Sequence, residues 1–152
     1  MKTVEQRFWD KVGPHGDPSK CWIWMAATIK AHKVKYGVFY VVGRQVMAHR
    51  FAYEMHHHVT IPKGMTIDHV KARGCTNTLC VNPYHLEVVT CRVNILRGSG
   101  FAAIKAKQTH CIHGHPLTEG NIYVYPSSPG SRKCRICSIE RSRERKKGVQ
   151  KG

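Results

Sequence analysis

The sequence has few acidic residues for its length. Nine of its 152 residues are Asp or Glu, whereas 25 are Lys or Arg, so the formal net charge is +16. Because so much charge of one sign opposes compaction, the composition favours a polyanionic partner and predicts nucleic-acid binding. A basic but inert surface is the alternative that composition alone leaves open.

Long hydrophobic runs are also missing. No stretch stays apolar over the roughly 20 residues that a membrane-spanning helix needs. The N-terminal segment MKTVEQRFWDKV is polar and lacks the features of a signal peptide. We therefore expect an intracellular protein, in the cytoplasm of a host cell or in a eukaryotic nucleus, that is neither secreted nor attached to a membrane.

Cysteines are present in an odd number, seven, without a secretory signal, which argues against a disulfide framework and favours zinc. Cys75, Cys80 and His85 have the spacing C-x4-C-x4-H, which is one ligand short of a tetrahedral site. Cys21 is the only cysteine upstream and can supply the fourth ligand. A second set combines C-x3-H with C-x2-C, although His110 and His113 compete with His115 for the nitrogen position. Cys91 is left over and is expected to be a small buried residue near the start of a helix. The two predicted structural zinc sites are Cys21, Cys75, Cys80 and His85, and Cys111, His115, Cys134 and Cys137.

Hydrophobic periodicity and turn residues predict a mixed α+β protein. Thr3 and Gln6 have the spacing of a capping box, so a helix is expected from there to the Gly-Pro pair at 13–14. The apolar run CWIWM, which begins at Cys21, predicts a strand. The run YGVFYVV, closed by Gly43-Arg44, predicts one arm of a β-hairpin.

In the middle of the chain, a strand, a Cys/His loop, a second strand and a helix are predicted in succession. AHRFAYEM has helical spacing, TID predicts a short strand that ends at His69, and LEVV predicts the second strand. Thr90 can cap a short helix that carries Asn94. Towards the C-terminus, two short strands are expected around a Ser-Pro-Gly turn, followed by a helix that frays at its end.

This order of elements, with the motif DH followed by C-x4-C-VNP-x-H-L and an Asn nine residues later, resembles the HNH, or ββα-metal, nuclease superfamily. More specifically, the chain resembles the zinc-bearing HNH proteins of phages and the related His-Cys box homing endonucleases. The C-terminal pattern of C-x2-GH-PL and C-x2-C resembles a small zinc module that often follows phage HNH domains. The resemblance implies an HNH nuclease domain over residues 1–100 and a zinc-binding module with a basic tail over residues 101–152.

The family resemblance also implies an activity, which is metal-dependent hydrolysis of phosphodiester bonds in DNA. In the family, the first histidine is the general base that activates water, here His69, and a helix residue binds the catalytic Mg²⁺ or Mn²⁺, here Asn94. Many relatives have His at the second position, and Asn is typical of the His-Cys box branch. An arginine near the site can stabilise the leaving group; Arg44 and Arg50 both match this description, and Arg50 is the candidate.

Basic residues before and through the predicted hairpin are candidate contacts to double-stranded DNA. Val34, Val38 and Tyr40 are expected to pack inward, and a two-stranded ribbon fits the major groove. The alternative is a solvated edge strand on which lysines suppress aggregation. The tail is expected to bind phosphates without sequence specificity, or to be disordered. The candidate DNA-binding residues are Lys30, Lys33, Lys35, Arg44, Arg141, Arg143 and Arg145.

Two other functions stay open on the sequence alone. One is a non-catalytic zinc-containing nucleic-acid-binding protein, in which His69 and Asn94 are incidental. The other is an RNA-directed nuclease or toxin built on the same core. A homodimer is compatible with any of the three.

Overall fold

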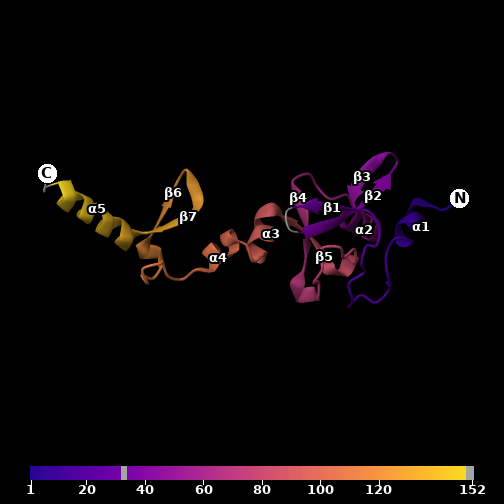
Figure 1. Ribbon diagram of the computed structural model, residues 1–152, viewed down its shortest axis with the longest axis horizontal. Helices are drawn as coiled ribbons and strands as arrows, with labels where there is room; N and C mark the ends of the chain where they lie inside the picture. The colour runs from indigo at the N-terminus through magenta and orange to yellow at the C-terminus, as the bar shows by residue number, and fades with distance from the viewer. Residues whose placement is uncertain (32–33, 150–152) are drawn as a thin grey trace. The chain divides into compact units, whose positions relative to one another are not determined.

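The computed structural model describes residues 1–31 and 34–149 and contains two compact units, Met1–Arg97 and Gly98–Gly152 (Figure 1). Both units combine short helices with small antiparallel sheets, which confirms the predicted α+β class. The division at Arg97 lies close to the one at residue 100 that the sequence predicts. Among the described residues, no helix is long and apolar enough to cross a membrane.

Among its described residues, the first unit holds a three-stranded sheet, a two-stranded sheet and three α-helices. The first sheet has the order β1-β2-β3, and β4 pairs antiparallel with β5 so that His69 lies opposite Leu86. The elements are α1 (Val4–Trp9), β1 (Thr28–Ala31), β2 (Val34–Val41), β3 (Arg44–Met47), α2 (Ala48–His57), β4 (Met65–His69), η1 (Lys71–Arg73), η2 (Pro83–His85), β5 (Leu86–Thr90) and α3 (Cys91–Arg97).

The capping box at Thr3 is confirmed, but helix α1 ends at Trp9, before the predicted stop at 13–14. The predicted strand at CWIWM is also wrong. Val12 forms an isolated bridge with Trp24, and Ile23 forms one with Cys80. Because neighbouring residues of this segment bond to two different parts of the chain, neither pairing extends into a regular strand.

An aromatic cluster forms the core of the first unit and fixes α2 against β2. Phe8, Trp24 and Phe39 are almost fully buried, and the ring of Phe8 lies 5.1 Å from that of Trp24 and 5.2 Å from that of Phe39. Gly37 permits this packing, since a Cβ there would lie 2.5 Å from the Trp24 ring. The cluster therefore positions the helix that follows β3.

The β2–β3 hairpin turns at Val42 and Gly43, which both have positive φ, as a two-residue type I′ turn requires. Val38 packs inward as predicted, but Val34 and Tyr40 are 40% and 56% exposed, which corrects their expected burial. Only the middle of β2 lies over the core, and its two ends extend beyond it. Lys33 lies outside the described residues.

The second unit contains α4 (Phe101–Lys107), η3 (Glu119–Asn121), β6 (Ile122–Tyr125), β7 (Ser128–Cys134) and α5 (Arg135–Val149). Tyr125 pairs with Ser128, so the hairpin turns at Pro126 and Ser127, and the predicted turn at Ser-Pro-Gly is wrong. That tripeptide instead opens β7, where the register shifts. Arg132 on β7 donates hydrogen bonds to the carbonyl oxygens of Lys105, Ala106 and Gln108, and so holds the end of α4.

Candidate active site and metal centres

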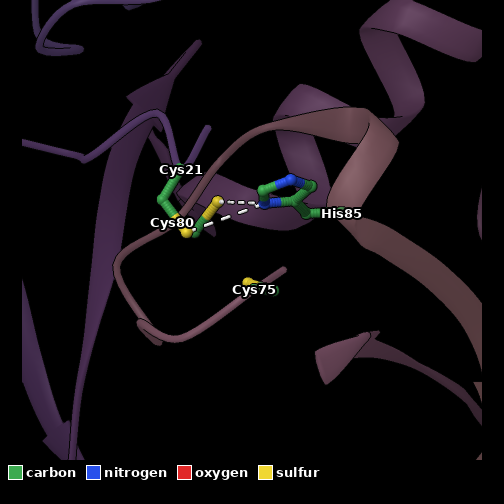
Figure 2. A group of neighbouring side chains, drawn as sticks. All are labelled: Cys21, Cys75, Cys80 and His85. Carbon is green, nitrogen blue, oxygen red and sulfur yellow. Dashed lines mark hydrogen bonds between the residues drawn. The ribbon is translucent and has the colours of Figure 1, made fainter. Parts of the chain in front are cut away.

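Four side chains from distant parts of the first unit meet in one cluster. The ligand atoms of Cys21, Cys75, Cys80 and His85 all lie within 4.8 Å of one another. His85 Nδ1 is 3.6 Å from Cys21 Sγ and 3.7 Å from Cys80 Sγ (Figure 2). The structure thus brings together the first predicted set of ligands, hereafter cluster 1.

Backbone pairing explains how Cys21 reaches this cluster across more than 50 residues. Trp24 N–H donates to the Leu79 carbonyl at 2.9 Å, and Val81 N–H donates to the Trp22 carbonyl at 2.8 Å. Asn82 is fully buried, and its side-chain amide donates to the Lys20 carbonyl at 2.7 Å. The segment after Cys21 is therefore fastened along the one that holds Cys80 without a regular strand.

A second cluster, cluster 2, lies in the C-terminal unit. Its ligand atoms, from Cys111, His115, Cys134 and Cys137, also lie within 4.8 Å of one another. His115 Nδ1 is 3.2 Å from Cys137 Sγ, and its Nε2 points towards Glu140 at 3.9 Å. Of the three competing histidines, His115 is the one that the structure places in the cluster.

Both clusters have the dimensions of a tetrahedral zinc site. Ligands about 2.0–2.3 Å from a central ion are separated from one another by roughly 3.3–3.8 Å. Two separations in cluster 1 are 3.6 and 3.7 Å, and four in cluster 2 range from 3.2 to 3.8 Å. Three sulfurs and one imidazole are also a donor set that zinc prefers. Either cluster could therefore hold a zinc ion.

The remaining cysteine does not behave as predicted. Cys91 is exposed at the first position of α3, whereas the sequence predicts a buried residue. Thr90 accepts a hydrogen bond from Val93 N–H at 3.2 Å, so the cap that starts this helix is confirmed. Cys91 follows directly after this cap, at the junction of β5 and α3, where its side chain is exposed.

His69 stands at the end of β4, next to cluster 1. Its Nδ1 lies 3.4 Å from Cys75 Sγ, and its Nε2 is buried with no hydrogen-bond partner among the described residues. A buried ring nitrogen without a partner costs free energy and is typical of positions that meet a water, an ion or a substrate atom. Burial lowers the pKa of His69 below its usual 6.5, although the charge of Asp68 opposes this shift.

A second buried histidine lies beside His69. The ring of His49, on α2, is 5.2 Å from that of His69, and its Nδ1 is likewise buried without a partner among the described residues. Burial, followed by the nearby charges of His69 and Arg50, lowers the pKa of His49 to about 3. Both rings are therefore neutral at neutral pH, and both present an unpaired nitrogen.

Asp68 is a candidate site residue that the sequence prediction did not include. Its carboxylate is nearly buried, and its Oδ2 lies 3.1 Å from Arg97 Nη1 on α3. Asn94 precedes Arg97 by one helical turn and is half-buried, so the two residues share one face of α3. Two features of the sequence could have indicated Asp68: its position directly before His69, and the i, i+3 spacing of Asn94 and Arg97 on the following helix.

The candidate arginines lie in different surroundings. Arg50 donates from Nη1 to the Met65 carbonyl at 3.2 Å, whereas Arg44 is exposed at the start of β3. Met65 is at the opposite end of β4 from His69, about 13 Å away along the strand. A role for Arg50 at the leaving group stays a prediction.

The candidate DNA-binding residues of the hairpin region are exposed where the structure describes them. Lys30 and Lys35 face each other directly across β1 and β2, and neither forms an ion pair with another described residue. Like charges at directly paired positions oppose strand pairing. In the second unit, Arg141, Arg143 and Arg145 are exposed on α5.

A comparison with known protein families found a match in the middle of the chain. Residues 46–95 match a family model described as HNH endonuclease. No curated protein and no solved structure was found to match the chain. The matched residues include His49, Asp68, His69, Asn94 and three of the four members of cluster 1, but neither Cys21 nor cluster 2. The match at residues 46–95 therefore supports an HNH-type nuclease.

Proposed function

We propose that the chain is a metal-dependent endonuclease that hydrolyses phosphodiester bonds in double-stranded DNA, with His69 as the general base. One observation carries this proposal. Within the residues that match the HNH family model, His69 has Nδ1 directed at Cys75 Sγ, while Nε2 has no partner among the described residues. Such a ring holds its proton on one nitrogen and offers a lone pair on the other.

The environment of His69 suits proton abstraction at neutral pH. Because burial lowers its pKa, the imidazole is uncharged there and can take a proton from water at Nε2. His49 and Tyr36 flank the ring, with centroids 5.2 and 6.5 Å away, and limit its rotation. In this arrangement the base is already in its active protonation state before substrate binds.

Asp68 and Asn94 are the proposed ligands of the catalytic divalent ion. A carboxylate oxygen and an amide oxygen are ligands that Mg²⁺ and Mn²⁺ accept, and both residues lie where β4 meets α3. A bound ion would neutralise charge on the scissile phosphate and on the leaving oxygen. Arg97, which now pairs with Asp68, would have to share or release this carboxylate.

Zinc in clusters 1 and 2 is proposed to be structural. Each cluster supplies four protein ligands, three of them sulfurs, and sites of this composition leave no open position for substrate. Cluster 1 joins the segment at Cys21 to the loop between β4 and β5. Cluster 2 joins the loop before β6 to the start of α5.

DNA contact is proposed for the β1–β2 region and for α5. Lys30 and Lys35 present two unneutralised charges at one point of a β-ribbon, and a phosphate group would relieve their repulsion. Arg44 at the hairpin turn and the exposed arginines of α5 extend the basic surface within their own units. These features and the net charge of +16 support a nucleic-acid substrate.

The test is cleavage of supercoiled plasmid by the purified chain with Mg²⁺, with and without EDTA. We expect Mg²⁺-dependent nicked or linear product, loss of cleavage in His69→Ala, and wild-type cleavage in His113→Ala, which changes an exposed histidine outside both clusters. Asn94→Ala should require a higher Mg²⁺ concentration for half-maximal cleavage, while its affinity for DNA stays close to that of the wild type.

The same experiment separates the alternatives. DNA binding without cleavage at any metal concentration would identify a non-catalytic nucleic-acid-binding protein. Faster cleavage of a matched RNA substrate would identify an RNA-directed nuclease. Loss of zinc or of folding in His69→Ala would move His69 from the catalytic to the structural residues.

A further inference from the structure

The side chain of His69 contacts a member of cluster 1. His69 Nδ1 and Cys75 Sγ are 3.4 Å apart, a hydrogen-bonding distance for sulfur, and Cys75 is 2% exposed. Cys21 and Cys80 instead direct their sulfurs at His85 Nδ1. Cys75 therefore differs from the other two cysteines of the cluster in its position beside the proposed base.

The backbone next to His69 is bonded to the same cluster. Val70 N–H donates to the His85 carbonyl at 2.9 Å, and the Val70 carbonyl accepts from Cys75 N–H at 3.4 Å. Gly74, with a φ of 83°, closes η1 and turns the chain so that Cys75 comes back towards β4. Two of the four residues of cluster 1 are thus held by the residue that follows His69.

The hydrogen bond has a consequence for the chemistry of His69. A neutral imidazole carries one N–H, and a thiolate accepts a hydrogen bond more strongly than a thiol does. A metal-bound Cys75 is a thiolate, so its sulfur favours the proton on Nδ1. Nε2 then keeps the lone pair that a general base requires. Hydrogen bonds between metal ligands and neighbouring residues are known to fix the tautomer and orientation of a histidine ring.

We propose that cluster 1 sets the tautomer and the orientation of His69 through Cys75 Sγ, in addition to holding the loop in place. Cys75 is then a positioning residue for the base, whereas Cys21 and Cys80 act only as ligands. This inference rests on the proposed function, since it assigns the tautomer that a catalytic His69 needs. It makes the occupancy of a structural metal site a condition for proton transfer.

The first test measures the tautomer of His69 directly in the full, zinc-loaded chain. Long-range proton–nitrogen NMR correlations distinguish the two tautomers, and comparison with His69→Gln assigns the signals. We expect His69 to carry its proton on Nδ1 at neutral pH. A proton on Nε2 would overturn the proposal, whatever the behaviour of any variant.

The second test compares Cys75→His with Cys80→His, which make the same change to two ligands of one cluster. Both keep a nitrogen ligand that zinc accepts, but only the first removes the sulfur beside His69. At equal zinc content, Cys75→His should shift the tautomer and lower kcat about 10- to 100-fold relative to Cys80→His, with similar KM. Equal tautomers in the two variants would overturn the proposal.

The tautomer also separates this inference from the proposed function. If the wild-type chain cleaves no DNA but has the Nδ1 proton, which Cys75→His alone removes, the coupling stands and the proposed function fails. If the chain cleaves DNA and His69 carries its proton on Nε2, the function stands and the coupling fails. If either variant loses its zinc, the comparison of variants is set aside and the proposal is judged by the wild-type tautomer alone: a proton on Nδ1 supports it, and a proton on Nε2 overturns it.

Discussion

Arg97 forms an ion pair with Asp68, the residue immediately before His69, with 3.1 Å between Nη1 and Oδ2. The same guanidinium contacts Glu87 at 2.9 Å, and Asp68 and Glu87 are paired across β4 and β5. A positive side chain thus lies against the carboxylate that we assign to the divalent ion. Arg97 and the proposed ion would therefore compete for one oxygen.

Removing Arg97 should therefore favour metal binding. We expect Arg97→Gln to reach half-maximal Mn²⁺ binding, followed by electron paramagnetic resonance, at a lower concentration than the wild type. Arg73→Gln is the control, because Arg73 contacts Glu87 at 3.6 Å but is not paired with Asp68. A titration that Arg97→Gln leaves unchanged would remove Asp68 from the proposed ligands.

Two zinc ions per chain are expected from the two clusters. Elemental analysis of protein purified without added metal should give about two zinc ions. Cys80→Ser and Cys137→Ser should each lose one ion, since each removes a ligand from a different cluster. Cys91→Ser should retain both because Cys91 is exposed and belongs to neither cluster. One zinc in the wild type would contradict one of the two assignments.

His49 should make the first unit sensitive to mild acid. Its pKa is lowered from 6.5 to about 3, so between these values the unfolded chain binds a proton that the folded chain does not. The free energy of unfolding should fall as pH decreases through this window, by at most about 1.4 kcal/mol per pH unit from this group.

The effect of His49 is measured by urea unfolding between pH 7 and pH 5.5. His49→Phe should show a shallower loss of stability than the wild type over this range. His56→Phe changes an exposed histidine on the same helix and should keep the wild-type slope. Identical slopes for all three proteins would show that the pKa of His49 is not lowered in the folded chain.

Gly37→Ala should destabilise the first unit because the added Cβ has no space. It would lie 2.5 Å from the Trp24 ring and 3.1 Å from the Ala48 Cβ. Overpacking of this kind costs about 1–3 kcal/mol, which thermal unfolding followed by tryptophan fluorescence can detect. Gly120→Ala is the control, since a Cβ there meets no atom within 4 Å. An unchanged midpoint in Gly37→Ala would mean that the Trp24 ring moves without cost.

The arginines of α5 should contribute affinity through phosphates. Replacing Arg141, Arg143 and Arg145 by Gln should weaken DNA binding and reduce the slope of log K against log salt by roughly 0.9 for each lost contact. Fluorescence anisotropy with a labelled duplex measures both quantities. The control replaces Glu144 of the same helix by Gln, which should not weaken binding. A triple variant with the wild-type slope would exclude α5 from the interface.

The sequence by itself determined which residues form the two Cys/His clusters and the order of the elements around them. Cysteine and histidine spacing predicted both ligand sets, because few donors were available and each set needs four. Local signals also sufficed for the capping box at Thr3 and for the cap at Thr90, since a cap depends on residues within one turn.

Tertiary structure decided what depends on partners far along the chain. The CWIWM segment has the composition of a strand, but its backbone bonds are divided between Val12 and the residues around Cys80. Burial followed the same rule: Val34, Tyr40 and Cys91 are exposed because no other described segment covers their side chains.

The environment of the proposed base also came only from the fold. The sequence placed His69 at the end of a strand, but its contact with Cys75 depends on the turn at Gly74. Its burial beside His49 depends on the aromatic core that fixes α2, and the pairing of Asp68 with Arg97 depends on how α3 packs against β4. Spacing predicts which residues can react, whereas their pKa values and hydrogen bonds arise from neighbours that only the folded chain brings together.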